Sequence, residues 1–262
     1  MEHNKVIRKA FSKQAASFGD TGLTLSNQDI LDWIVDLLPL DKQFRVLEVA
    51  AGTGHLSLAI APHVREVVAI DITTEMLEQA RAEARRRKLD NLSFEEENAE
   101  KLPYQKDHFD LVVSRLAIHH FKKPIIQLRE MVRVCKPNHR IGVIDLLSPE
   151  DKRIAKTYNH LERLRDPSHT VALSKKQMTN ILGEVGIVVE KIEVRDIEVD
   201  FQRWVKMTGT KSRTAEILKE ELMRDIGGSK TGMRPFMKNS QLKFLQVWSV
   251  IYGTKISKPG RT

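Results

Sequence analysis

Cysteine is almost absent from this 262-residue sequence, in which Cys135 is the only one. A disulfide within the chain is therefore excluded, as is typical of proteins from reducing compartments. The sequence also lacks the apolar segment of a secretion signal at its start, and no apolar run approaches the length of a membrane-spanning helix. These absences predict a cytoplasmic protein without a membrane span.

Motifs for metal chemistry are also missing. There is no His-Glu-x-x-His segment, and the histidines and the cysteine do not have the spacing of a structural zinc site. We therefore predict no metal ion. Cys135 lies in the apolar segment "MVRVCKP" and is expected to be buried, which makes it an unsuitable nucleophile.

The balance of charge is only moderately basic. The 43 lysines and arginines outnumber the 35 aspartates and glutamates, which gives a net charge of +8. Such an excess can favour nucleic acid, but here the basic residues are scattered along the chain, and the densest run, residues 85–88, ends a predicted helix. We expect a solvated basic surface and no nucleic-acid partner, and the sequence leaves a homodimer open.

What the sequence does contain is an alternation of short apolar runs and helical patterns. Seven runs have the length and composition of buried strands, and amphipathic segments separate most of them. The runs are residues 45–50, 66–71, 92–98, 109–115, 140–147, 187–199 and 242–255. This alternation predicts an α/β fold, a doubly wound, mostly parallel, seven-stranded sheet of the Rossmann-like type with helical cap inserts.

The whole chain, residues 1–262, is predicted to form a single domain. Residues 1–40 have helical spacing and precede a ligand-binding core over residues 41–148. Residues 149–173 and 201–239 interrupt the alternation; the first is predicted to be a helix followed by a loop, and the second mostly helical. We expect these two inserts to form a lid over a substrate.

The loop after the first predicted strand has two alanines before its two glycines, in the order Ala50, Ala51, Gly52 and Gly54. Glycines in such a loop let the backbone approach a ligand closely, and in a parallel sheet ligands lie beyond the carboxyl ends of the strands. The dinucleotide fingerprint Gly-x-Gly-x-x-Gly is incomplete, because Ser57 stands at its last position. The loop alone leaves two ligands open, a dinucleotide or S-adenosylmethionine (SAM).

Glu48 favours SAM over a dinucleotide. Its carboxylate stands just before the loop, where it would repel a pyrophosphate at the helix N-terminus. SAM has no phosphate, and its ammonium and sulfonium groups suit a nearby carboxylate. Asp71 ends the second predicted strand, about 20 residues further on, where an acid accepts hydrogen bonds from the ribose hydroxyls of either ligand.

A family resemblance is carried by four blocks that occur in order: "VLEVAAGTGHLSLAIA", "VVAIDITTEMLEQAR", "ENAEKLPYQKDHFDLVVSRLAIHHF" and "LREMVRVCKPNHRIGVIDLL". Together they resemble the class I SAM-dependent methyltransferases, in the branch (methyltransferase type 11) that includes the ubiquinone/menaquinone-biosynthesis C-methyltransferases. The segment "YNHLERLRDPSH" resembles a YcgJ-like subgroup of uncharacterised bacterial members. The resemblance implies SAM as the methyl donor and S-adenosylhomocysteine (SAH) as its product.

The resemblance also implies which residues bind the cofactor. They are Glu48, Ala50, Ala51, Gly52, Gly54 and Ser114 at the methionine end, Asp71 at the ribose, Ile72 and Met76 against the adenine or ribose, and Asn98 and Ala99 at the adenine edge. Ala50 replaces the family's usual first glycine, and Asn98 replaces an aspartate whose hydrogen-bond acceptor it retains. Ordinary core packing is the alternative role for Ile72 and Met76.

Methyl transfer from a sulfonium is an in-line displacement with a good leaving group, so the protein mainly aligns the reactants and excludes water. A general base is needed only where the acceptor must lose a proton. His119 and His120 follow the fourth predicted strand on its ligand-facing side and are the candidate catalytic residues. The alternatives are that they line the substrate pocket or bond to backbone groups at a helix start.

Residues that bind the acceptor are expected at the end of the fifth predicted strand and in the first insert. The candidates are Asp145, His160, Arg163 and His169, with Arg165 and Asp166 beside them. Arginine suits a carboxylate or phosphate on the acceptor. The alternative for the insert residues is a salt-bridged surface helix and its loop.

These patterns predict a SAM-dependent methyltransferase that acts on O, N or C of a small organic acceptor. One alternative is C-methylation of a quinone ring, for which Met207, Met223, Met233, Phe236 and Met237 would supply an apolar mouth. Another is an RNA-binding or RNA-modifying protein, which the basic charge suggests. The segment "SRLA" lacks the Asn/Asp-Pro-Pro-aromatic motif of enzymes that methylate exocyclic amines of nucleic acids.

Overall fold

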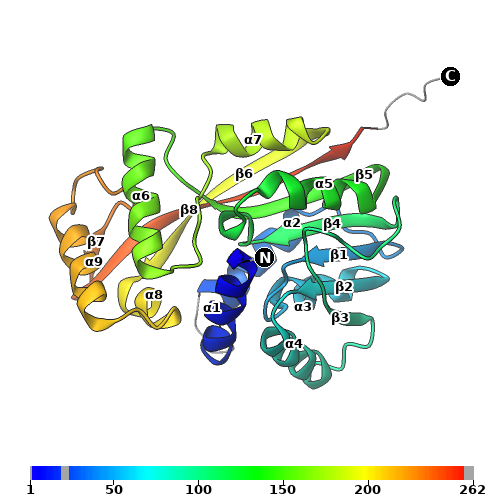
Figure 1. The fold of residues 1–262 in the computed structure, drawn as a ribbon, viewed down its shortest axis with the longest axis horizontal. Coiled ribbons are helices and arrows are strands. Elements are labelled where there is room, and N and C mark those ends of the chain that lie inside the picture. The colour runs from blue at the N-terminus through cyan, green and yellow to red at the C-terminus, as the bar shows by residue number, and fades with distance from the viewer. Residues whose placement is uncertain (1, 19–23, 257–262) are drawn as a thin grey trace.

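A computed structural model describes residues 2–18 and 24–256, which form one β-sheet with helices on both faces (Figure 1). The strands are β1 Arg45–Val49, β2 Glu66–Asp71, β3 Leu92–Glu96, β4 Phe109–Arg115, β5 Cys135–Leu147, β6 Ile187–Asp200, β7 Phe236–Lys238 and β8 Gln241–Lys255. Their order is β3-β2-β1-β4-β5-β8-β6, with β7 paired to β8 beside this path. The first five strands are parallel, and β8 runs antiparallel to both β5 and β6.

All seven predicted strands are present in this sheet, which confirms the doubly wound, mostly parallel fold. The apolar runs of β1, β2 and β4 are buried along almost their whole length, because helices cover both faces of the sheet. The strand order reverses between β1 and β4. The carboxyl ends of these two strands therefore flank the crevice where such sheets bind their ligands.

The helices are α1 Glu2–Phe18, α2 Gln28–Leu37, α3 His55–Ile60, α4 Thr74–Arg86, α5 Pro124–Val134, α6 Lys152–Arg165, α7 Lys175–Glu184, α8 Phe201–Met207 and α9 Ser212–Arg224. Helices α6, α8 and α9 gather with β7 at one end of the sheet, on the left in Figure 1, and α1 lies between this group and α4. Of the N-terminal segment predicted to be helical, residues 1 and 19–23 lie outside the described residues. Within the described ranges, each helix is too short or too polar to cross a bilayer.

The second insert is less helical than predicted. Residues 201–239 contain α8 and α9, but they also contain β7, which forms a hairpin with the start of β8. The hairpin turn consists of Asn239 and Ser240, whose φ angles are both positive, at 51° and 60°. Two successive residues of this kind form the turn whose twist matches a two-residue hairpin. The sequence does not predict it, because the turn lacks the glycine that usually marks such a connection.

Candidate active site

The loop between β1 and α3 curls back through three residues of positive φ. They are Ala50 at 57°, Gly52 at 56° and Gly54 at 72°. The amide of Ala51 donates to a backbone carbonyl of β2 at 2.9 Å, which fastens the loop to the neighbouring strand. A Cβ on Gly54 would lie 3.0 Å from Cβ of Ala80, so a side chain there would pack tightly against α4. Ala50 thus adopts a conformation that favours glycine, at the position where the family usually has one.

Asp71, at the end of β2, holds this loop in place. Its Oδ2 accepts the amide of Gly52 at 2.8 Å, and its Oδ1 accepts the amide of Thr73 at 2.9 Å. Burial raises the pKa of the Asp71 carboxyl, and the two amides oppose the rise. Each carboxylate oxygen has a second lone pair, so Asp71 can accept further hydrogen bonds from a ligand.

Glu48 is buried in β1, with only 2% of its surface exposed. Its Oε2 accepts the amide of Ser57 at 2.8 Å and also the Ser57 hydroxyl. The residue that breaks the dinucleotide fingerprint is therefore the one that anchors Glu48. Burial raises the pKa of Glu48 to about 7, and the Ser57 hydroxyl and the charge of Arg115 oppose the rise.

A cavity beyond the ends of β1 and β2, here named the donor cavity, brings most of the predicted cofactor residues together. It is lined by Glu48, Ala50, Ala51, Gly52, Asp71, Ile72, Met76, Asn98 and Ala99. Gly54 and Ser114 do not line it, because Gly54 caps α3 and the Ser114 hydroxyl donates to the Val49 carbonyl at 2.9 Å. Ile7 and Phe11 of α1 add apolar surface to the cavity wall.

Arg115, the last residue of β4, also lines the donor cavity, although no sequence motif singles it out. Its Nη2 donates to the Leu25 carbonyl at 2.9 Å, and its guanidinium lies 5.6 Å from the ring centre of Trp248. Its Nε is buried without a hydrogen-bond partner in the part of the chain that is described. Burial lowers the pKa of Arg115 to about 10, and the charge of Glu48 opposes the change. Two buried groups of opposite charge thus border one cavity.

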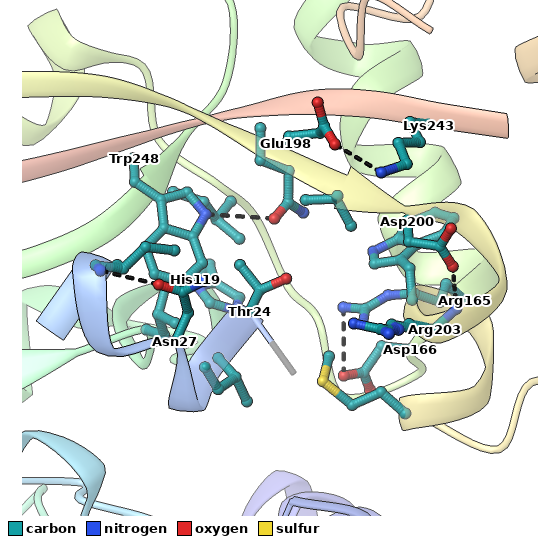
Figure 2. Close-up of a pocket in the computed structure, with 18 of the residues that line it drawn as sticks. Thr24, Asn27, His119, Arg165, Asp166, Glu198, Asp200, Arg203, Lys243 and Trp248 are labelled. Carbon is teal, nitrogen blue, oxygen red and sulfur yellow. Dashed lines mark hydrogen bonds and ion pairs between the residues drawn. The ribbon is translucent and has the colours of Figure 1, made fainter. Parts of the chain in front are cut away.

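A second cavity, here named the acceptor cavity, is drawn in Figure 2. The two share the wall formed by Phe11, Leu25, Leu116 and His120. The inserts contribute Arg165, Asp166, Arg203, Trp204 and Met207, and β6 and β8 contribute Glu198, Val199, Asp200, Lys243, Gln246 and Trp248. The inserts line the acceptor cavity and contribute nothing to the wall of the donor cavity.

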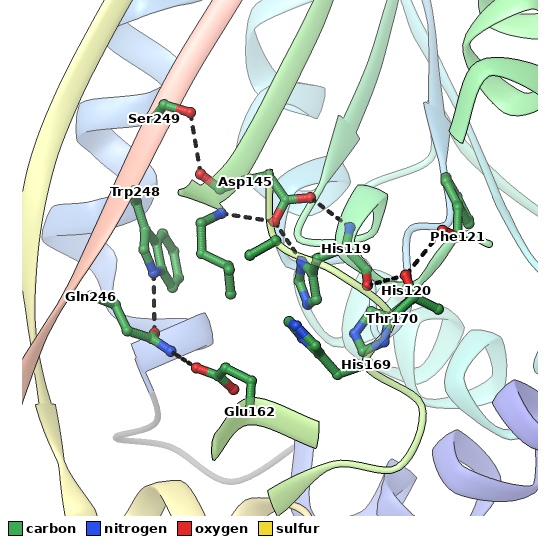
Figure 3. A network of polar contacts seen from close by, with 12 residues as sticks. His119, His120, Phe121, Asp145, Glu162, His169, Thr170, Gln246, Trp248 and Ser249 are labelled. Carbon is green, nitrogen blue, oxygen red and sulfur yellow. Dashed lines mark hydrogen bonds and ion pairs between the residues drawn. The ribbon is translucent and has the colours of Figure 1, made fainter. Parts of the chain in front are cut away.

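His119 lines the acceptor cavity and is backed by a buried aspartate (Figure 3). Its Nδ1 lies 2.5 Å from Oδ1 of Asp145, and its amide donates to Oδ2 at 3.3 Å. Asp145 is fully buried near the end of β5 and lines neither cavity, so it contacts His119 without bordering the space beyond it. An ionised Asp145 favours the tautomer in which Nδ1 carries the proton and Nε2 can accept one.

Two further histidines lie beside His119. His120 lines both cavities with its Nδ1 3.1 Å from the Ser168 hydroxyl, and burial lowers its pKa to about 4, with the neighbouring His119 adding to the decrease. His169 lines neither cavity; its Nε2 lies 2.8 Å from Oδ1 of Asn159, and burial lowers its pKa strongly. Both rings are therefore neutral near neutral pH. His169 packs 5.3 Å from the His119 ring, behind the cavity wall.

Two other predicted acceptor residues lie away from both cavities. His160 and Arg163 are exposed on α6, and the Arg163 side chain donates to the Thr170 carbonyl at 2.9 Å. Arg165 and Asp166, at the end of the same helix, line the acceptor cavity instead. Neighbouring helical residues point in different directions, so the sequence alone does not show which of them meets the cavity.

The methionines considered for an apolar mouth are dispersed. Met207 lines the acceptor cavity, whereas Met233 is buried in the core, and Met223 and Met237 are exposed. These residues therefore do not form one apolar surface at the mouth of the cavity.

Comparisons with known proteins identify the family of this chain. A family model described as "Methyltransferase domain" matches residues 40–197, more than half of the chain. The chain belongs to this methyltransferase family. The uncharacterized methyltransferase YcgJ of Bacillus subtilis is 33% identical over 200 residues, which cover 76% of this methyltransferase and 79% of YcgJ. The crystal structure of YcgJ matches with a TM-score of 0.81 at 28% identity, over 88% of this methyltransferase and 100% of that chain.

A more distant relative belongs to the predicted branch, and a further structure shares the fold. The ubiquinone/menaquinone biosynthesis C-methyltransferase UbiE of Azotobacter vinelandii is 32% identical over 129 residues, which cover 48% of this methyltransferase and 51% of UbiE. The geranyl diphosphate C-methyltransferase of Streptomyces coelicolor, solved with S-adenosyl-L-homocysteine, shares the fold with a TM-score of 0.60 at 13% identity, over 87% and 78% of the two chains. The predicted family is thus confirmed, and the protein is an enzyme of the SAM-dependent methyltransferase class.

Proposed function

We propose that this methyltransferase transfers a methyl group from SAM to a small organic acceptor, with His119 as the base that takes the acceptor's proton. The observation that carries the proposal is the pair of adjoining cavities, with His119 lining the one on the acceptor side. An in-line displacement needs the acceptor atom in direct line with the methyl carbon and in contact with it, and two cavities that meet at common lining residues suit this arrangement. The two inserts cover the acceptor and exclude water.

The donor cavity has the charged and hydrogen-bonding groups that SAM needs. The methionine end of SAM carries an ammonium and a carboxylate, for which Glu48 and Arg115 offer opposite charges. A ligand carboxylate would also satisfy the unpaired Nε of Arg115. Asp71 has lone pairs for the ribose hydroxyls, and Asn98 and Ala99 border the space for the adenine. When bound, SAM supplies an electrophilic methyl group on a cationic sulfur.

In the transfer step, the acceptor atom forms a bond to the methyl carbon while the sulfur–methyl bond breaks. The bonding electron pair stays on sulfur, which leaves SAH, and the acceptor's proton passes to Nε2 of His119. Asp145 is a positioning residue, because it holds the Nδ1–H of His119 and stabilises the imidazolium that forms. An O–H, N–H or acidic C–H group on the acceptor meets this requirement.

Isothermal titration calorimetry with SAH tests the donor site. We expect wild type to bind SAH and Asp71→Ala to lose at least about tenfold in affinity, because the ribose loses its hydrogen-bond acceptor. Asp90→Ala, which removes an exposed carboxylate outside the donor cavity, is the matched control and should bind like wild type. A folded wild-type protein that does not bind SAH overturns the proposal.

A further inference from the structure

Resting on the proposed methyl transfer, we infer that the acceptor is a small organic acid. Its carboxylate binds Arg165 and the indole N–H of Trp204, and its apolar body packs in the acceptor cavity beside His119. The basic and acidic side chains that line this cavity are equal in number if the histidines are left aside, so net charge does not select a ligand. The buried N–H groups of the wall that lack a hydrogen-bond partner do favour one kind of ligand.

The carboxylates that line the acceptor cavity already have partners. Glu198 accepts from two lysine side chains, at 2.7 and 2.8 Å. Asp200 accepts a backbone amide of α8 at 2.9 Å. Asp166 accepts the amide of Ser168 at 2.9 Å and its hydroxyl at 2.6 Å. The carboxylates of the wall therefore have little need of a further hydrogen-bond donor on the ligand, apart from the group whose proton His119 takes.

The basic part of the wall is different. Arg165 is 6% exposed, and its Nη2 lies 3.1 Å from Glu162. The same Nη2 lies 3.9 Å from Asp166, and Arg165 and Asp166 are both labelled in Figure 2. The Nε and Nη1 of Arg165 are buried without hydrogen-bond partners among the described residues, and the same is true of Nε1 of Trp204. The guanidinium of Arg165 lies 5.0 Å from the ring centre of Trp204, so these unpaired donors come from two side chains in contact. Buried donors without partners are costly, and a ligand that accepts from them removes the cost.

An amine is a poor occupant of the same place. A cation binds over the face of a tryptophan, but Arg165 already lies over Trp204 and Arg115 over Trp248. A second cation would meet repulsion from these guanidinium groups. A carboxylate instead brings two acceptor oxygens and an opposite charge, which a guanidinium binds more strongly than a neutral carbonyl.

Three compounds that share the same hydroxyphenyl body and differ in the terminal group test this inference. They are 3-(4-hydroxyphenyl)propionate, its primary amide and 3-(4-hydroxyphenyl)propylamine, and each is titrated by NMR into SAH-saturated protein. We expect the acid to bind about tenfold or more tightly than the amide, and the amine to bind least, because only the acid offers a charged acceptor to Arg165.

Two variants and a matched control test whether Arg165 and Trp204 cause the preference for the acid. Arg165→Lys keeps a cation beside Glu162 but removes the guanidinium fork, and should lower the acid-to-amide ratio at least about threefold. Arg163→Lys makes the same change on the exposed side of α6 and should leave the ratio unchanged. If thermal melting shows that Arg165→Lys does not fold, Trp204→Phe keeps an aromatic ring without the N–H and should lower the ratio in the same direction.

The outcomes separate this inference from the proposed function. Equal binding of acid and amide, tighter binding of the amine, no binding of the acid at millimolar concentration, or a ratio unchanged in folded variants overturns the inference while SAH still binds. A wild-type protein that fails to bind SAH overturns the proposed function instead.

Discussion

Glu48 and Arg115 line one cavity with side chains of opposite charge, and burial disfavours the charged form of both. It raises the pKa of Glu48 to about 7 and lowers the pKa of Arg115 to about 10, because each charged form loses hydration. A ligand with an ammonium and a carboxylate offers each group an opposite charge. Ligand binding and ionisation of Glu48 are therefore expected to favour one another.

SAH binding is accordingly expected to weaken at acid pH. The folded protein protonates Glu48 below about pH 7, so a ligand that needs the carboxylate loses about tenfold in affinity between about pH 8 and about pH 6. Arg115 stays charged over this range, and burial also raises the pKa of Asp71. Calorimetry across the pH range should show a much flatter profile for Glu48→Gln. An unchanged slope in Glu48→Gln would instead assign the effect to Asp71.

Asp145 is predicted to set the tautomer of His119. Asparagine at this position can donate to Nδ1, which would place the proton of the neutral ring on Nε2 and remove the base from the cavity. In Asp145→Asn, ¹⁵N NMR of His119 should show the proton moved from Nδ1 to Nε2, and methyl transfer should fall at least about a hundredfold with SAH affinity unchanged. Ser249→Ala, which removes a hydroxyl bonded to the Asp145 carbonyl at 3.2 Å, is the control and should keep the wild-type tautomer.

Among the elements, the loop between β1 and α3 is well specified by its sequence, apart from one residue. Glycine fits the positive φ angles at Gly52 and Gly54, and the strand-end acids Glu48 and Asp71 hold the loop from two sides. The residues predicted for this element follow from short-range patterns, and most of those residues line one cavity in the structure. Arg115 is the residue that those patterns miss, because only the packing of β4 against Trp248 and Glu48 gives it significance.

Ala50→Gly is expected to stabilise this loop. Glycine adopts a φ of 57° without the clash of a Cβ, so the free energy of unfolding should rise by about 0.5–1 kcal/mol. Thermal melting should show a midpoint about 1–4 °C higher, with SAH affinity about equal to wild type. The control, Ala82→Gly on the exposed side of α4, should instead lower the midpoint. A large gain in SAH affinity for Ala50→Gly would mean that the alanine obstructs the ligand.

The inserts were harder to predict as elements. Helical spacing predicts a helix in the first insert and a mostly helical second insert, but it does not tell which residues of α6 face inward. Arg163 and Arg165 are two residues apart, yet one is exposed and the other is buried against Trp204. The β7–β8 hairpin is decided by pairing between segments and by two residues with positive φ.

On the scale of the whole molecule, the shared wall joins the two cavities. Phe11, Leu25, Leu116 and His120 line both, so a ligand in one cavity orders the surface that the other ligand meets. Helix α1 supplies one of these residues and also adds Ile7 to the donor cavity. The arrangement predicts that the donor and acceptor ligands bind cooperatively.

SAH is therefore expected to raise the affinity for 3-(4-hydroxyphenyl)propionate about fivefold or more. By linkage, the acid must raise the affinity for SAH by the same factor, and both titrations can be carried out by calorimetry. Phe11→Ala should reduce the coupling, whereas Ala82→Gly, far from the wall in sequence and exposed, should not. Identical affinities with and without the second ligand would show that the shared wall does not couple the sites.

The sequence by itself determined seven of the eight strands, the class of fold and the position of the loop between β1 and α3. These follow from apolar runs, helical periodicity, and glycines and acids at strand ends, all of which are local patterns. Only the tertiary structure decided the acceptor side. The pairing of His119 with Asp145 and of Arg165 with Trp204 joins segments that are distant along the chain. Which side chains meet there depends on how the inserts pack onto the sheet, and no local period encodes that packing.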